Sequence, residues 1–509
     1  MIRLIRTDRG GMLKAVRRIL LLPGLLLCGA LSVYPQAPSA GEVQAGNPQH
    51  LSPGEAVDMA IRNNLSLETA RIGLDIKKRK SNLVWNEFLP TLGVNGILSR
   101  TNWASSQSVT SAIPGTGTPV TLQGRSGLLN PTTFSTEVSL PQWSLNGMFT
   151  ASLYFSFALI EGIQSFKEDY QAGLISYEKA KLQMEQGVRK MYNQILLQEA
   201  SAALLLENYN NARRQADIAE ANFRAGLAPR LTWLQAQVAV ENMKPTMNDM
   251  DNGLKSLKGN FALLLGLSYD TPFELESISF GVSYIPDDVA NLISRAASGK
   301  PDIQELQANI MTLQTQRKAQ RLQAYTPFLN FGWTVSSSFS EDPWKDNWFN
   351  RENWRAGGSF SITLGMNFNG LFPFTKEGQQ RKDMDAGLQI QNIRLAQTIQ
   401  ETELEVFTKV NSLEKIRTTK DAQQAAVDLA EESYKLTEEA YRAGLQDFQA
   451  VRSAGLALEQ AKLQLLTQQF NYLNDLIDLE YSIGVPFGTL SSSGNIVSER
   501  TPSNKGSVK

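Results

Sequence analysis

Apolar residues recur along this chain with two different spacings, and each spacing predicts a different kind of element. Apolar side chains alternate with polar or small ones in residues 329–336 and 360–369, and less regularly in residues 91–99 and 149–159. Because neighbouring residues of a strand point to opposite faces, these four segments predict two hairpins, each with one apolar and one polar face. Long polar segments join the two strands of each pair (residues 103–133 and 341–355).

The other spacing places apolar residues three and four positions apart and predicts helices of unusual length. Residues 164–224 contain no proline, and about 60 residues at a rise of ~1.5 Å form a helix of roughly 90 Å. Returning helices are predicted over residues 231–265 and 451–483. The apolar seam is rich in small side chains, which permit close helix packing (Ile195, Ala202, Leu205, Tyr209, Ala212, Ala216, Ala219 and Phe223, then Val427, Ala430, Tyr434, Thr437 and Tyr441).

A further helix is predicted near the start of the chain, over residues 51–85. Ser52 suits an N-cap, Pro53 suits the first turn, and Glu55 stands at the third helical position of a capping box. Pro90 cannot continue a helix and ends the segment.

The same order of segments occurs twice. Tyr-Arg-Ala-Gly-Leu-Gln-Asp-Phe at 441–448 resembles Phe-Arg-Ala-Gly-Leu-Ala-Pro at 223–229. Further matches lie upstream of each copy (residues 88–92 with 325–329, and 64–67 with 300–303). The period of roughly 220 to 240 residues is far too long for a solenoid repeat. Each copy is therefore expected to be a structural half with its own strands and helices.

Composition and single residues exclude several functional classes. The formal net charge is −1 at pH 7, which does not fit nucleic-acid binding. His50 is the only histidine, and no Walker-type loop, metal triad or catalytic constellation is present, so neither an enzyme nor a cofactor is expected. Isolated Asp and Glu on the outer faces of the heptads are expected to be solvated.

The N-terminus predicts export. Basic residues before position 19 and an apolar run over residues 19–30 indicate a signal peptide within residues 1–40. Cys28, the only cysteine, lies inside it and is either removed with it or serves as a lipid attachment point; Leu27 is larger than the residue that lipidation signals prefer at that place. No later segment is apolar over the roughly 20 residues of a membrane-spanning helix. A membrane crossing would therefore use strands.

Taken in order, and twice, these segments resemble the TolC-type outer membrane efflux proteins. The resemblance covers residues 51–490, and its most family-like parts are short (residues 51–57 with Asn63 and Asn64, Leu89-Pro90, Ala225-Gly-Leu227 followed by Leu234-Gln-Ala236, and Lys300-Pro-Asp302). It implies an α+β membrane protein of the outer membrane with a large periplasmic portion. Three chains would form a homotrimer with a 12-stranded β-barrel, four strands from each chain, continued by an α-helical coiled-coil barrel.

A physical count agrees with the trimer, because four strands cannot close a barrel and an open edge in lipid leaves backbone groups unpaired. The expected organisation is a first repeat over residues 41–267, a connector over 268–299 and a second repeat over 300–490. A disordered tail is expected over 491–509.

The resemblance implies a passive exit channel of a tripartite efflux or type I secretion system. Its expected partners are a periplasmic adaptor, an inner-membrane pump of the RND, ABC or MFS class, and outer-membrane lipid. The residues alone leave an alternative open, a soluble periplasmic coiled-coil scaffold or adaptor whose strands form a sandwich. In the channel interpretation the polar strand faces line the barrel lumen (Asn330, Thr334, Ser336, Ser361, Thr363, Asn367 and Asn369), and the alternate residues face lipid.

The two Ala-Gly-Leu turns have a simple structural explanation, because glycine in a left-handed conformation caps a helix and the next residue packs back on it. In the family such tips resemble an adaptor-docking surface, which would here comprise Gly226, Leu227, Gly444 and Leu445.

A periplasmic constriction is expected beside these turns. Relatives often place acidic rings there, but residues 448–453 contain no carboxylate. Asp447 lies closer to the turn, and Arg230 and Arg452 could form a basic or salt-bridged constriction or be exposed helix-end charges. Cation selectivity is therefore not indicated.

A methionine row raises a metal hypothesis. Met243, Met247 and Met250 have helical spacing, and thioethers are soft ligands suited to Cu(I). Such rows are usually packing residues, and no Cys or His accompanies this one. Pro245 in the same segment predicts a kink or a junction between helices.

Overall fold

The computed structural model describes residues 49–100, 143–278, 288–339, 350–443 and 445–492. The chain divides into residues 1–49 and residues 50–509, and all helices and the larger sheet belong to the second unit. Several predicted features lie outside the described residues: the signal peptide with Cys28, the segment 103–133, most of 341–355, Gly444 and the tail from residue 493.

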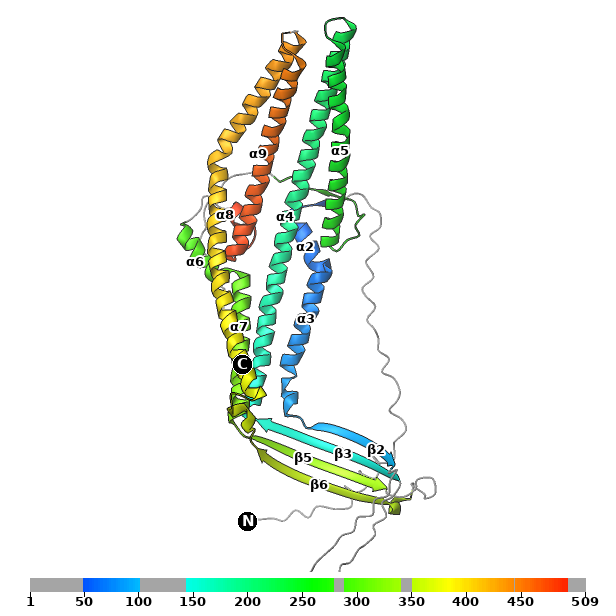
Figure 1. Ribbon diagram of the computed structural model, residues 1–509, viewed down its shortest axis with the longest axis vertical. Coiled ribbons are helices and arrows are strands. Elements are labelled where there is room, and N and C mark those ends of the chain that lie inside the picture. Colours follow the sequence, from blue (N-terminus) through cyan, green and yellow to red (C-terminus); the bar gives the residue numbers. More distant parts are fainter. Residues whose placement is uncertain (1–48, 101–142, 279–287, 340–349, 444, 493–509) are drawn as a thin grey trace, which may run out of the picture. The chain divides into compact units, whose positions relative to one another are not determined.

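The elements of the second unit occur in two similar series (Figure 1). The first comprises α2 (Pro53–Asn63), α3 (Leu65–Asn82), η1 (Val84–Phe88), β2 (Thr91–Arg100), β3 (Trp143–Ser156), α4 (Phe157–Arg224) and α5 (Arg230–Leu264). The second comprises α6 (Val289–Gly299), α7 (Pro301–Tyr325), β5 (Phe328–Phe339), η2 (Arg351–Asn353), β6 (Trp354–Gly365), η3 (Phe368–Leu371), α8 (Lys376–Arg442), α9 (Phe448–Ile483) and α10 (Thr489–Ser492). Two short strands, β1 (Gln49–Leu51) and β4 (Phe273–Leu275), form a separate small sheet.

Three of the four pairs of corresponding helices have nearly equal lengths, and α3 and α7 differ, with 18 and 25 residues. The long helices α4 and α8 have 68 and 67 residues, and the returning helices α5 and α9 have 35 and 36. The short helices α2 and α6 have 11 residues each. The repeated sequence segments therefore fold into repeated elements.

Among the described helices, none has the length and apolar character needed to cross a membrane.

The helix predicted over residues 51–85 is broken into two helices and a 3-10 turn. Its beginning is as predicted, because the Ser52 Oγ accepts the Glu55 backbone N–H at 3.3 Å while Glu55 Oε2 accepts the Ser52 N–H at 3.0 Å. The break lies at Asn64, whose Oδ1 accepts the N–H groups of Ser66 and Leu67 and caps α3. Asn64 Nδ2 also donates to the carbonyl oxygen of Leu264 at 2.8 Å. A hydrogen bond between residues 200 positions apart in the sequence thus stabilises the break between the two helices.

Two predicted strand ends are wrong. The strand that contains Phe149 ends at Ser156, and Phe157 and Leu159 already belong to α4. Phe157 and Ile160 also have helical spacing, so the alternation was ambiguous there. This helix consequently starts well before residue 164.

The last strand ends at Gly365, so Asn367 and Asn369, both predicted to line a barrel, lie outside it. The Asn367 side chain accepts the Asn369 N–H at 3.0 Å and begins η3. Such a local bond competes with the sheet ladder.

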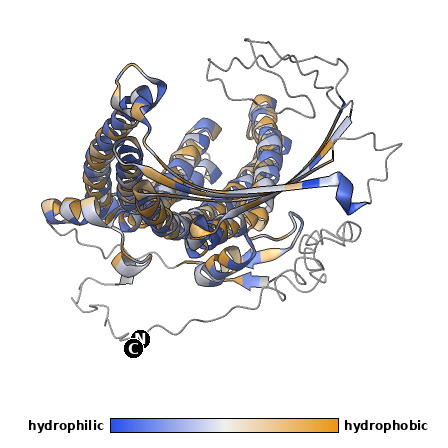
Figure 2. Ribbon diagram, turned by 90° about the horizontal axis from the view of Figure 1, so that it is seen from below, coloured by the Kyte–Doolittle hydropathy of each residue, from blue (hydrophilic) through white to orange (hydrophobic). Residues whose placement is uncertain are grey.

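The larger sheet is antiparallel with the order β2-β3-β5-β6, so the two hairpins pair through β3 and β5. Leu92 pairs with Ala151, Ala151 with Trp333, and Trp333 with Phe360. This register aligns most apolar residues of the four strands on one face, with exceptions such as Ile97, Met148 and Tyr154 on the other. The sheet is curved (Figure 2), and β2 and β6 form its two edges.

In the part of the chain that the structure describes, three buried clusters hold the helices together. One joins α6, α8 and α9, and a second joins α2, α4 and α5 with β1 and β4. The third joins the far ends of the two long hairpins, α4–α5 and α8–α9. In the second cluster the Tyr192 hydroxyl donates to the carbonyl oxygens of Leu51 and Glu276, and burial raises the pKa of Tyr192 to about 12.

The returning helices end at matching glycines. Gly266 and Gly484 have φ of 75° and 68°, in the left-handed region. A Cβ at Gly266 would lie 2.5 Å from the Asn63 carbonyl oxygen, and one at Gly484 would collide with the Gly299 carbonyl oxygen. Each glycine therefore lets a returning helix end against the break between two shorter helices.

Gly484→Ala is expected to destabilise the protein by about 2 kcal/mol or more, because a left-handed alanine costs roughly 1–2 kcal/mol and its Cβ has no room. The control is Gly187→Ala, at a position in α4 where nothing lies within 4 Å of the new Cβ; removing a helical glycine should stabilise by about 0.5–1 kcal/mol. Thermal unfolding of both variants checks the difference, and equal melting temperatures would contradict it.

Candidate functional site

The two hairpin tips share a backbone hydrogen bond that spans five residues. In the first, Gly226 has φ of 75°, its N–H bonds to Phe223 O, and the Leu227 N–H bonds to Asn222 O at 2.8 Å. In the second, the Leu445 N–H bonds to Ala440 O at 2.8 Å. The bonds from Leu227 and Leu445 each span five residues, as in a Schellman cap. The left-handed glycine cap predicted for the first turn is confirmed at Gly226.

The prediction that the next residue packs back on the helix is wrong for the leucines of both tips. Leu227 and Leu445 are each 79% exposed. A hydrophobic residue at this place of the motif usually contacts the last helical turn. Both tips therefore present a bare leucine to the surroundings.

The ends of the two hairpins are joined beneath the tips. Ala219 and Val451 are fully buried in the cluster that links them, and the rings of Phe223 and Trp233 stack at 5.6 Å. Gln215 Nε2 on α4 donates to the Tyr434 hydroxyl on α8 at 3.0 Å. The two exposed leucines are therefore next to a well-packed part of the helical hairpins.

The three residues predicted for a constriction lie near this base and are exposed. Asp447 caps α9 by accepting the Ala450 N–H at 2.8 Å. Arg230 is the first residue of α5, and Arg452 lies in the first turns of α9. Within the described part of the chain neither arginine forms an ion pair. The structure of one chain thus favours the exposed helix-end explanation over a salt bridge inside the chain.

The polar residues predicted for the barrel interior share one sheet face where they remain in strands. Asn330 pairs with Thr363, and Gly332 pairs with Ser361, while Thr334 and Ser336 follow at alternate positions. The opposite face carries large apolar side chains that are exposed in the single chain, such as Phe360 at 67%. The sheet therefore has one polar and one exposed apolar face.

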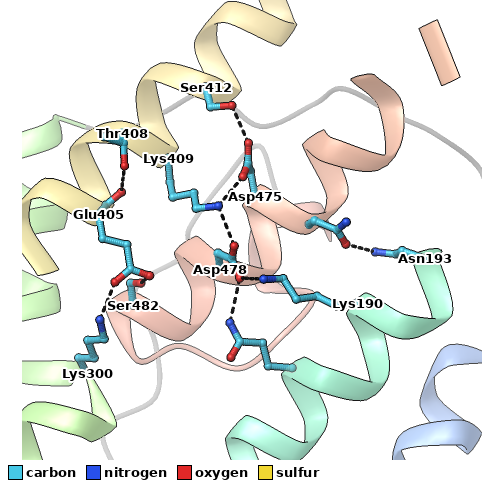
Figure 3. Close-up of polar contacts among 12 residues, drawn as sticks. Lys190, Asn193, Lys300, Glu405, Thr408, Lys409, Ser412, Asp475, Asp478 and Ser482 are labelled. Carbon is cyan, nitrogen blue, oxygen red and sulfur yellow. Dashed lines mark hydrogen bonds and ion pairs between the residues drawn. The ribbon is translucent and has the colours of Figure 1, made fainter. Parts of the chain in front are cut away.

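A polar network that the sequence pattern did not reveal joins the two halves (Figure 3). Asp478 on α9 binds Lys190 Nζ of α4 at 2.5 Å and Lys409 Nζ of α8 at 2.7 Å. Asp475 binds the same Lys409 at 2.7 Å. Asn193 Nδ2 donates to Asn474 Oδ1 at 2.9 Å. The network thus ties α4 of the first half to α8 and α9 of the second.

The expectation that acidic residues on the helices are solvated is wrong for this region. Asp478 is 7% exposed and Glu480 is 2% exposed. Glu480 accepts the backbone N–H groups of Gly488 and Leu490, at 2.9 and 2.7 Å. One feature of the sequence could have indicated this burial. Asp478 and Glu480 lie within the mostly apolar segment 476–483, which has more apolar positions than a helix with one exposed face allows.

Ion pairing sets the pKa values of the network. Burial alone would raise the pKa of Asp478, but the hydrogen bonds from Lys190 and Lys409 outweigh it and hold the pKa below 3.8. Burial would lower the pKa of Lys409, and the bonds to Asp475 and Asp478 instead raise it. Burial raises the pKa of Glu480, although two backbone N–H groups partly offset that effect.

The depressed pKa of Asp478 predicts acid sensitivity. Its stabilising contribution is present above the ordinary aspartate pKa of 3.8 and is lost as the pH falls through the lower folded value. The melting temperature of the wild type should therefore fall more steeply than that of Asp478→Asn when the pH is taken from neutral to below 3.8. Circular dichroism melting at a series of pH values checks this, and parallel curves for the two proteins would refute it.

The methionine row lies along one unbroken helix. Helix α5 continues through Pro245, so that residue does not end a segment. Met243, Met247 and Met250 are half-buried, and the Met250 sulfur accepts Gln198 Nε2 of α4 at 2.6 Å. In the described ranges no group of three or more His, Cys, Asp or Glu could hold a metal ion.

Comparison with known proteins identifies the family. A family model described as outer membrane efflux protein matches residues 56–266 and 292–485. The fold is similar to that of the outer membrane protein VceC from Vibrio cholerae, with 14% identity, a TM-score of 0.63, and coverage of 86% of this chain and 96% of that one.

Two further solved structures are similar. The channel protein CusC has 16% identity and a TM-score of 0.63, covering 85% of this chain and 92% of that one. The CmeC outer membrane channel of Campylobacter jejuni has 16% identity and a TM-score of 0.62, covering 85% of both chains. Comparison with curated protein sequences gave no significant match. Because the two family segments together span most of the chain, this protein belongs to the outer membrane efflux protein family and is a protein of the outer membrane.

Proposed function

We propose that three copies of this chain form the passive exit channel of a tripartite efflux or type I secretion system. The observation that carries the proposal is the four-stranded sheet, which has two edges and an exposed apolar face and is continuous with two long helical hairpins. A sheet edge left open in lipid would leave backbone groups unpaired. Pairing β6 of each chain with β2 of the next would close a barrel of twelve strands.

The dimensions of the strands support this proposal. Strand β5 has 12 residues, which extend for roughly 40 Å at ~3.4 Å per residue. With a tilt of about 35–45° the strand would rise roughly 30 Å, close to the ~25 Å apolar band of outer-membrane barrels. In this arrangement the face with Asn330, Thr334, Ser336, Ser361 and Thr363 would line the lumen. The face with Phe360 would contact lipid.

The hairpin tips would then form the periplasmic end of the tunnel. We assign Leu227 and Leu445, with Gly226 and Gly444 beside them, to the docking of a periplasmic adaptor. The constriction of the tunnel would lie close to this periplasmic end, near Arg230, Asp447 and Arg452. Export energy would come from an inner-membrane pump of the RND, ABC or MFS class, because a passive channel does not supply energy itself.

Native mass spectrometry of protein extracted from its own membranes in mild detergent tests the assembly. A threefold subunit mass is expected, and the residual mass per subunit would show whether Cys28 is lipidated or removed. A monomer recovered from the soluble fraction would overturn the channel and favour the periplasmic scaffold.

A further inference from the structure

The segments where helices meet the larger sheet combine exposed aromatic rings with an excess of positive charge. Helices α3, α7 and α8 each have one end near the larger sheet (Figure 1), where η1 contacts α3 and η3 contacts α7 and α8. Its large exposed rings form a set that we name the aromatic belt (Trp85, Phe88, Tyr325, Phe368, Phe372 and Phe374). Each of these rings lies within ten residues of the end of β2, β5 or β6.

The part of the aromatic belt around η3 is rigidly built. Thr375 Oγ1 donates to the Phe372 carbonyl oxygen at 2.7 Å and accepts the Gly378 N–H at 3.1 Å. A Cβ at Gly370 would lie 2.6 Å from the Ala324 Cβ, and one at Gly378 would collide with the Phe372 carbonyl oxygen. The loop nevertheless holds Phe374 at 83% exposure. A tightly packed loop that keeps an aromatic ring exposed is suited to contact with another surface.

Positive charge lies directly beside these rings. Residues 77–90, 314–328 and 366–385 contain ten Lys and Arg against four acids, Glu87, Glu377, Asp383 and Asp385. The first turns of α4, residues 157–170, contain one further cation, Lys167, and three acids, Glu161, Glu168 and Asp169. The net charge of all these segments together remains positive.

Some of these cations are neutralised within the chain and others are not. Lys77 pairs with Asp169, and Arg317 and Arg321 both pair with Asp385. Of the ten Lys and Arg in residues 77–90, 314–328 and 366–385, six are exposed and form no ion pair within the described residues, and we name them the cation belt (Lys78, Arg79, Lys80, Lys318, Lys376 and Lys382). Both repeats contribute to it. The cation belt therefore provides unpaired positive charge where the helices meet the larger sheet.

We propose that the aromatic belt and the cation belt together bind anionic phospholipid in the periplasmic leaflet of the outer membrane. Aromatic rings favour the boundary between headgroups and acyl chains. Clustered Lys and Arg beside an apolar surface attract anionic headgroups. The cations lie on the helical side of the rings, which is where phosphate groups would lie if the apolar sheet face were in the hydrocarbon. The inference rests on the proposed barrel and adds a lipid preference to it.

The experiment uses the full-length protein and vesicles of phosphatidylethanolamine with or without phosphatidylglycerol. The test variant replaces the cation belt by glutamine (K78Q, R79Q, K80Q, K318Q, K376Q and K382Q). The matched control removes six exposed and unpaired cations from the helical body (R62Q, R213Q, R394Q, K415Q, K420Q and K435Q). Both variants lose the same charge, so a difference between them reports position.

Phosphatidylglycerol is expected to raise the melting temperature and the vesicle affinity of the wild type and of the control variant. The cation-belt variant should lose this preference, with a fall in affinity for the anionic vesicles on the order of tenfold. An unchanged preference in that variant would overturn the proposal. Loss of the preference in both variants would also overturn it, because net charge rather than the belt would then be responsible.

A second variant tests the rings and does not depend on charge. F374S removes an exposed side chain, so folding should be unaffected, and it should weaken binding to both kinds of vesicle equally; unchanged binding would refute the contribution of the ring. Native mass spectrometry separates the two levels of inference. A monomer that inserts into neither vesicle would refute the channel itself, whereas an inserted trimer without a lipid preference would refute only the lipid site.

Discussion

Replacing Leu227 and Leu445 together by glutamate is expected to abolish export while trimers of normal stability persist. Each leucine is 79% exposed and contributes little to the packing of its own chain. The backbone bonds of both tips involve no leucine side-chain atom, so the turns should keep their form. The loss would therefore come from the removal of an apolar contact with a partner, and central contacts of this kind cost roughly 2 kcal/mol or more each.

The measurement is substrate export in cells that lack the wild-type protein, combined with cross-linking to the adaptor and native mass spectrometry of the variant. Leu227→Met with Leu445→Met should retain export, because the apolar contact is kept. Gln446→Glu adds a charge to the second tip without removing a leucine and should have a much smaller effect. Normal export by the glutamate double variant would disprove docking through the leucines.

Asp478→Ala is expected to lower the free energy of unfolding by about 3 kcal/mol, since removal of one partner of a buried ion pair typically costs about 3–5 kcal/mol. We take the lower end because Lys190 is 39% and Lys409 27% exposed, and both can regain some hydration. The change leaves Lys190 and Gln186 without their partner at the contact between the two halves. Thermal and denaturant unfolding of the purified protein measure the effect.

The control for this change is Asp421→Ala, which removes an exposed aspartate of α8 and should alter stability by less than about 0.5 kcal/mol. Adding Lys409→Met to Asp478→Ala should cost less than Lys409→Met alone, because the interaction is already lost. Additive effects of the two changes would mean that Lys409 and Asp478 are not coupled.

Features governed by neighbours in the sequence were predicted well. The capping box at Ser52 and Glu55, the helix cap at Gly226 and the alternation over 329–336 all depend on groups a few residues apart. Ends of elements were predicted less well. Strand β3 ends before Phe157, where the apolar spacing fits both a strand and a helix. Strand β6 ends at Gly365, because the side-chain bond of Asn367 competes with the sheet ladder.

By itself, the sequence determined the two periodicities, the duplication of the helices and strands, and the family, because each rests on local spacing or on direct comparison of residues. Only the tertiary structure decided which charges are buried. Asp478 and Lys190 are 288 positions apart, and Asn64 and Leu264 are 200 apart, yet both pairs are in contact. The cost of burying a charge depends on the groups that replace water around it, and those groups come from distant parts of the chain.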